Sequence, residues 1–185
     1  IGFSAHPFSR ARADMGSPDD LISYACLALA TINERIPPNL RKEVISVLID
    51  NTKHSSVTIR ENAILSLGLC GNLIEPPSKV IQRLHIALYD NVDIIRSRSC
   101  QAIGRLWNFP SSDELKDILE RLLVLSSDTS YKVRIAVAFA LKNLQNRKDL
   151  GDLSSRSIKE TLKILSEDIS FQVRKEVAFK DLYRA

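Results

Sequence analysis

Apolar residues recur along this chain at intervals of three or four, which is the spacing of helices with one buried face. The same arrangement returns four times, and each copy contains an apolar residue followed directly by arginine. These arginines are Arg60, Arg96, Arg134 and Arg174, so that successive copies lie 36, 38 and 40 residues apart. A period of this size indicates an internal structural repeat.

Further columns align with the repeated arginine. Leucine stands twelve residues before it in every copy, and aspartate stands six residues before it in three copies, with His54 in the remaining one. A small or β-branched residue follows three positions after the arginine, and leucine or isoleucine follows after seven, except at Asp181. The aspartates are Asp90, Asp128 and Asp168. Chance does not produce so many matching columns in four copies.

Each copy predicts two helices. The apolar positions one residue before the arginine and three, seven and ten after it form one stripe at helical spacing, which marks the second helix, and the first helix lies upstream. Second helices are expected near 56–70, 92–107, 130–145 and 170–184, and an additional one near 19–34. First helices are expected at 39–53, 78–89, 112–126 and 155–167, with prolines at or before the first turn of three of them. The sequence therefore predicts an all-α fold of about nine antiparallel helices, roughly four repeats plus one extra N-terminal helix.

The chain divides into two predicted parts. Residues 19–185 form the repeat domain, and residues 1–18 form an N-terminal tail or cap, since they lack a sustained helical stripe. Ile1, Phe3 and Phe8 would allow this segment to cover the first helix of the array, as terminal repeats require.

The combination of aspartate, an apolar residue before arginine, a small residue and leucine resembles the HEAT repeat. The resemblance spans about residues 19–185. It implies a right-handed α–α superhelix, an armadillo-like solenoid whose second helices line the inner, concave surface. It also implies that the four arginines pair with Asp90, Asp128 and Asp168 in a ladder that fixes the stacking of repeats. Arginine suits this role because its planar fork donates several hydrogen bonds in a fixed geometry.

A binding surface is expected at positions of the second helices that the apolar stripe leaves free. The candidate partner-binding residues are Arg98, Arg105, Trp107, Lys142 and Lys175. Tryptophan and arginine are enriched in interface hot spots, and the positive charges favour an acidic segment of another protein. The competing interpretations are that Trp107 packs beneath the following turn and that the charged residues are ordinary solvated ones.

Three classes of function follow, of which a non-catalytic scaffold or adaptor for protein partners is preferred. The 26 Lys and Arg against 22 Asp and Glu give a net charge of +4, so nucleic-acid binding through the inner helices is the alternative. A HEAT-like enzyme such as a bilin lyase or an alkylpurine glycosylase is the second alternative. The histidines are isolated and no HExxH, CxxC or glycine-rich phosphate loop is present, so no catalytic residue, metal or cofactor is predicted.

The cysteines suggest a compartment. Cys26, Cys70 and Cys100 are an odd number without paired spacing, which favours a reducing, intracellular location, cytoplasmic or alternatively nuclear. No apolar run reaches the roughly 18 residues of a membrane span, and the first residues lack the pattern of a secretory signal. No membrane partner is therefore expected.

Overall fold

The computed structural model describes residues 17–73, 77–106, 109, 112–145, 147 and 150–178. Within these residues the chain forms nine α-helices and no strand. The helices are α2 (Pro18–Thr31), α3 (Arg41–Asn51), α4 (Val57–Cys70), α5 (Ser78–Ala87), α6 (Asp93–Arg105), α7 (Ser112–Leu125), α8 (Tyr131–Leu144), α9 (Gly151–Ser166) and α10 (Phe171–Ala178). Two 3-10 turns, η1 (Asn33–Arg35) and η2 (Gly71–Leu73), follow α2 and α4. The predicted all-α fold with its nine helices is confirmed.

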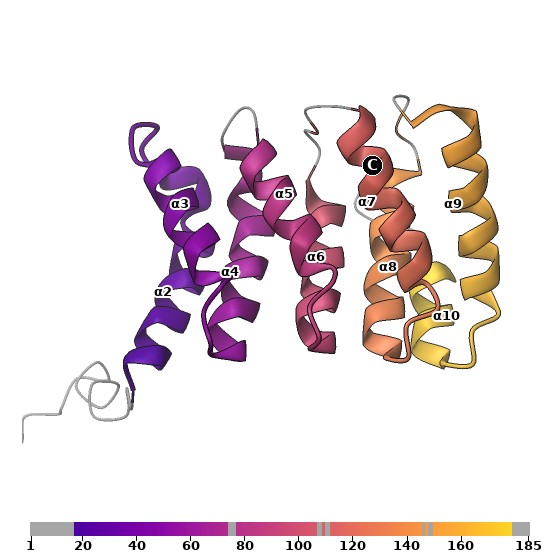
Figure 1. Cartoon of the computed structure of the whole chain (residues 1–185), viewed down its shortest axis with the longest axis horizontal. Helices are drawn as coiled ribbons and strands as arrows, with labels where there is room; N and C mark the ends of the chain where they lie inside the picture. The colour runs from indigo at the N-terminus through magenta and orange to yellow at the C-terminus, as the bar shows by residue number, and fades with distance from the viewer. Residues whose placement is uncertain are drawn as a thin grey trace, which may run out of the picture.

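The helices lie in two rows (Figure 1). The second helices of the repeats, α4, α6, α8 and α10, continue the row begun by α2, and the first helices α3, α5, α7 and α9 lie in front of them. Packing is closest within the row of second helices, where each helix lies against the next. The first helices touch one another far less. We call these the inner row and the outer row.

Glycines allow the close approach within the inner row. A Cβ added to Gly68 on α4 would stand 2.6 Å from Cα of Ala102 on α6, and one added to Gly104 would stand 3.0 Å from Cα of Ala140 on α8. A Cβ on Gly68 would stand closer to the neighbouring backbone than real Cβ atoms do, and one on Gly104 would also stand 2.8 Å from Cε1 of Phe139, so neither position readily takes a side chain. These contacts set the spacing between successive second helices.

The repeat columns supply the core. The residue before each repeated arginine is fully buried in all four copies, and the leucine twelve residues before it is fully buried in three and 8% exposed in the last, Leu162. Apart from Ile59, these residues form one continuous apolar cluster along the array, together with the small residues of the second helices. Each repeat therefore buries its apolar faces only against its neighbours, as in other solenoids.

The largest difference from the predicted helix bounds lies at α9, which begins at Gly151 rather than Ser155. Ser155 resembles a capping residue in the sequence, but its hydroxyl donates to the carbonyl of Gly151, 2.9 Å away, and so lies inside the first turn. A serine that bonds back to the preceding turn is compatible with a helix interior. Gly151 itself has a φ of 71°, a conformation that favours glycine.

Candidate functional site

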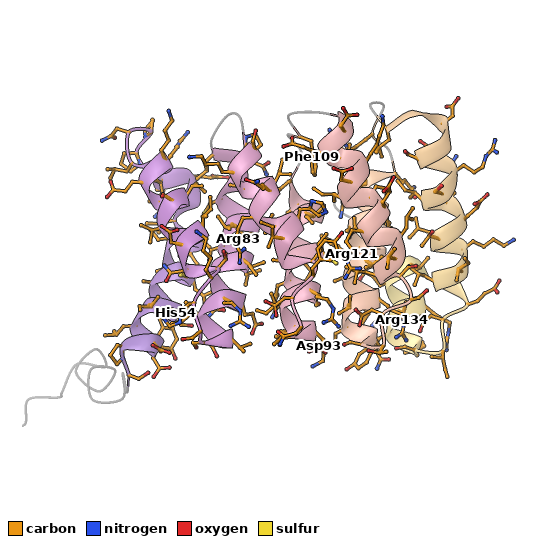
Figure 2. All side chains as sticks on the ribbon, viewed as in Figure 1. His54, Arg83, Asp93, Phe109, Arg121 and Arg134 are labelled. Atoms are coloured by element: carbon orange, nitrogen blue, oxygen red, sulfur yellow. The ribbon has the colours of Figure 1, made fainter. Side chains whose placement is uncertain are left out.

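The repeated arginines join neighbouring repeats. Nε and Nη2 of Arg96 donate to the two carboxylate oxygens of Asp128, at 2.9 and 3.0 Å, and Nη1 donates to the carbonyl of Asp90 at 2.9 Å. Arg134 repeats this arrangement with both carboxylate oxygens of Asp168, at 2.7 and 2.9 Å. Each of these arginines thus holds the loop of its own repeat and the aspartate of the next one (Figure 2 labels Arg134).

The aspartates of the ladder also shape the turn between the two helices of a repeat. One carboxylate oxygen of each accepts the backbone N–H two residues further on, in Val92, Ser130 and Ser170. The hydrogen bonds from Arg134 lower the pKa of Asp168, and the N–H of Ser170 lowers it further. In return, the carboxylates raise the pKa of the Arg96 and Arg134 guanidinium groups.

The ladder is weaker at its N-terminal end. Arg60 reaches Asp90 through a single ion pair of 3.5 Å, and its Nε is buried without a hydrogen-bond partner. His54 replaces the aspartate of the preceding rung, and its Nδ1 accepts the N–H of Ser56 at 3.1 Å, so it preserves the turn. The preceding helix α2 supplies no arginine to pair with residue 54. When α2 and α4 are aligned at their N-cap serines, Ser17 and Ser56, the position of Arg60 is occupied by Leu21, so no carboxylate is needed there.

A second set of arginines, which the sequence analysis did not single out, joins the outer helices. Arg83 on α5 donates to the hydroxyl of Thr52 and, at 2.8 Å, to its carbonyl, whereas Arg121 on α7 donates to the carbonyl of Leu88 at 3.1 Å. Thr52 and Leu88 are the C-caps of α3 and α5, where a cation satisfies terminal carbonyls and opposes the helix dipole. Figure 2 labels both arginines.

Two of the predicted partner-binding residues are engaged between repeats. Nε of Arg98 lies 2.9 Å from Oε1 of Glu61 on α4, and its Nη1 donates to Gln101. Nζ of Lys142 donates to the carbonyl of Glu176 on α10 at 2.8 Å and lies 3.5 Å from its carboxylate. These contacts connect neighbouring second helices in the same way as the ladder does.

Arg105, in the last turn of α6, differs from these residues. Its guanidinium lies 5.6 Å from the centre of the Phe139 ring and makes no hydrogen bond or ion pair within the described part of the chain. Partial burial lowers the pKa of Arg105, and the nearby charge of Arg98 lowers it further. The side chain is therefore a cation that the surrounding protein stabilises poorly.

A small hollow surrounds Arg105 on the inner row. It has a volume of about 90 Å³ and is bordered by Gln101, Arg105, Ile135, Phe139 and Glu176. A cation, an aromatic ring, an aliphatic side chain, an amide and the carboxylate of Glu176 thus meet at the junction of α6, α8 and α10, and Glu176 is itself engaged by Lys142. Of the other two candidates, Lys175 is exposed on α10, and Trp107 lies outside the described residues.

The described residues contain no arrangement that indicates catalysis. Among them, no three His, Cys, Asp or Glu side chains lie close enough to hold a metal ion. Cys26, Cys70 and Cys100 are free and buried, and desolvation raises the pKa of Cys70 to about 11 and that of Cys100 further still. Such thiols are poor nucleophiles. Of the described helices, none is long and apolar enough to cross a membrane.

Comparison with known proteins identifies the repeat. Residues 118–147, which cover most of α7 and all of α8, match the HEAT repeat family. The fold is HEAT/armadillo-like, and one segment of the chain matches the HEAT repeat itself. This confirms the resemblance found in the sequence, in which Asp128 and Arg134 belong to the matched segment. No protein with a curated description matches the sequence.

Solved structures share the HEAT/armadillo-like fold along nearly the whole chain. A designed armadillo repeat protein in complex with the peptide (KR)4 has a TM-score of 0.65 at 18% identity, over 94% of this chain and 79% of that one. Computationally designed armadillo repeat proteins for modular peptide recognition give 0.60 at 18% identity, over 92% and 78%. The complex of CpcE and CpcF of phycocyanin lyase from Nostoc sp. PCC7120 gives 0.57 at 20% identity, over 83% and 96%. At these identities the likeness concerns the fold.

Proposed function

We propose that this protein is a non-catalytic scaffold whose inner row holds a segment of another protein. The repeat fold supports a binding function, since designed proteins of this fold are described as recognising peptides. Solenoids also offer an extended surface that a chain can follow over several repeats. The three free, buried cysteines support an intracellular site of action, cytoplasmic or nuclear.

The observation that carries this proposal is the guanidinium of Arg105, which lies over the Phe139 ring and makes no hydrogen bond or ion pair with the described residues. A carboxylate placed beside it would form a charge-assisted, two-pronged hydrogen bond, which is the contact that arginine makes best. An aliphatic neighbour of that carboxylate would lie against Ile135 and Phe139, which border the same hollow. The proposed partner is therefore an acidic segment with an apolar residue beside the acid.

The remaining candidates take two different roles in this proposal. Arg98 and Lys142 keep the frame of the site by pairing with Glu61 and Glu176, rather than contacting the partner through free charges. Lys175 flanks the surface as an exposed cation, and Trp107 stays a predicted contact. Arg60, Arg96 and Arg134 serve the stacking of repeats, whereas Arg174 donates to the loop carbonyls of its own repeat within the described residues.

The test measures binding of short fluorescent peptides in which a glutamate follows a leucine, compared with peptides that carry glutamine instead. We expect Arg105→Gln to weaken the tightest glutamate peptide about tenfold, as loss of a charged hot-spot contact does. Lys159→Gln is the matched control, because Lys159 is an exposed cation on α9 of the outer row. Equal affinities of glutamate and glutamine peptides, or equal losses in both variants, would contradict the proposed site.

The two alternatives give different results with the same protein. Nucleic-acid binding predicts an affinity that falls steeply with salt, because phosphate contacts release counterions. Two inner cations, Arg98 and Lys142, are already paired with carboxylates, which disfavours a continuous positive track. A bilin lyase function predicts that a linear tetrapyrrole changes its absorbance on mixing with the protein, and only the likeness to the CpcE and CpcF complex supports it.

A further inference from the structure

The seam between α5 and α7 in the outer row is hollowed along its length. Two hollows of about 340 and 310 Å³ follow one another along it. Both are bordered by His85 of α5 and Asp117 of α7, so they form one groove, which we call the outer groove. It lies on the first helices and is separate from the hollow around Arg105, which only second helices border.

The smaller of the two hollows, which Tyr89 and Val124 border, exposes apolar side chains that neighbouring residues hold in place. Tyr89 is 60% exposed and Val124 is 64% exposed, and both border the same hollow. The Tyr89 ring lies 4.1 Å from the guanidinium carbon of Arg121 and 5.7 Å from the ring of His85. Because Arg121 is held by the carbonyl of Leu88, the ring is supported from beneath while much of its surface stays open to a partner. A large exposed aromatic residue held in this way is typical of an interaction site.

More carboxylates than cations border the outer groove, namely Glu114, Asp117 and Glu120 against Lys79 and Arg121. Asp117 and Glu120 are exposed and make no ion pair or hydrogen bond with any residue that the structure describes. Of the two cations, Arg121 is already engaged, because its guanidinium donates to the carbonyl of Leu88 and lies over the Tyr89 ring. The protein as a whole carries a net charge of +4, so a groove in which carboxylates outnumber cations stands out from it.

A hydrogen-bonding group is also left unused in this seam. Nε2 of His85 is buried and has no partner, and of all described side-chain nitrogens and oxygens only Nε of Arg60 is in the same state. Native proteins rarely leave such atoms unpaired unless something else satisfies them. Together, the hollow, the exposed ring, the free carboxylates and this nitrogen indicate a surface that is incomplete without a partner.

We propose that the outer groove docks a basic segment of a partner protein that carries an aliphatic or aromatic anchor. The anchor lies on Tyr89 and Val124, and lysine or arginine side chains on either side of it reach Asp117 and Glu120. This surface is independent of the inner row, which is proposed to take an acidic segment. One chain then connects two partners of opposite charge through its two faces.

The test uses a fluorescein-labelled peptide in which each leucine is followed by two lysines, and a matched peptide with glutamates in place of the lysines. We expect the 185-residue chain to bind the lysine peptide and not the glutamate peptide. Asp117→Asn combined with Glu120→Gln should weaken binding about tenfold, and Tyr89→Ala should weaken it by a similar factor with an unchanged salt dependence. Arg105→Gln should leave this affinity unchanged, which separates the outer groove from the proposed inner site.

A control with the same change in charge guards against general attraction between opposite charges. Glu43→Gln combined with Glu160→Gln neutralises two exposed carboxylates elsewhere in the outer row, on α3 and α9. This double variant should change the affinity for the lysine peptide less than about twofold, because single exposed charges contribute little. Circular dichroism melts of all variants should coincide, because the substituted side chains are exposed. Failure of the lysine peptide to bind, equal weakening by both double variants, or binding lost through Arg105→Gln would each overturn the proposal.

Discussion

The inner and outer rows of this solenoid follow the same sequence period but differ in how closely their neighbouring helices pack. In the inner row, glycine meets alanine at backbone contact, and charged pairs join each repeat to the next from α4 to α10. In the outer row, hollows of about 310 to 460 Å³ separate neighbouring helices. The residue ten positions before the repeated arginine is an exposed apolar one in three repeats, namely Ile86, Val124 and Ile164. Residues that recur in every repeat therefore have two different roles: in the inner row they join neighbouring repeats, and in the outer row they form accessible apolar surface.

The largest difference between the rows should come from adding volume. Gly68→Leu places a side chain where a Cβ alone would stand 2.6 Å from the Ala102 backbone, so α4 and α6 must move apart. We expect a loss of about 3 kcal/mol in the free energy of unfolding, at the upper end of overpacking costs. Val124→Leu adds a methylene group in the outer row and should cost almost nothing, because Val124 is 64% exposed. Urea denaturation of both variants measures the contrast, and similar losses would show that the rows are equally constrained.

Removing one rung of the ladder should have the next largest effect. Arg134→Ala leaves the carboxylate of Asp168 and the loop carbonyl of Asp128 without their donor, which should cost about 2 kcal/mol. Arg60→Ala should cost about half as much, since Arg60 makes a single ion pair of 3.5 Å and already has an unsatisfied Nε. Arg156→Ala, an exposed arginine of the outer row, is the control. Thermal melts measure the losses, and equal losses of stability in Arg60→Ala and Arg134→Ala would contradict a ladder that is weaker at its N-terminal end.

The ladder also predicts how stability depends on pH. The pKa of Asp168 is lowered in the folded protein, chiefly by its hydrogen bonds from Arg134, and that of Asp93 is lowered by the hydroxyl of Ser130. A lowered carboxyl pKa contributes stability that is fully present above the ordinary value of about 4 and is lost as pH falls through the folded pKa. Asp168→Asn should therefore cost about 1.5 kcal/mol at pH 7, and progressively less as pH falls below about 4. Denaturant titrations at neutral and acidic pH test this, and a cost that is independent of pH would contradict it.

The sequence alone predicts the helices and the buried positions of both rows, but not the contacts between their side chains. The helices and the buried stripe follow from local periodicity, because the residue before each repeated arginine lies on the same helix face in every copy. The ion pairs do not follow from it, since Arg98 and Lys142 meet Glu61 and Glu176, which lie 37 and 34 residues away. The residues that face each other across two neighbouring repeats depend on how far one helix is shifted along its axis relative to the next, and local periodicity does not give this shift. A spacing search would have found Arg83 and Arg121, both thirteen residues before the repeated arginine, but Val47 and Thr161 fill this column in the other two copies.

The smallest effect should come from the exposed apolar residues of the outer row. Ile164 is 69% exposed, so Ile164→Ser removes little buried area and should change the free energy of unfolding by less than about 0.5 kcal/mol. Leu162, only two residues earlier, is 8% exposed and belongs to the shared core, so Leu162→Ser should cost about 3 kcal/mol. If Ile164→Ser were as destabilising as Leu162→Ser, as judged by urea denaturation, the outer row would be packed against something within the chain. A small cost would instead mean that Ile164 is kept apolar for reasons other than folding, as we infer for Tyr89 and Val124 in the outer groove.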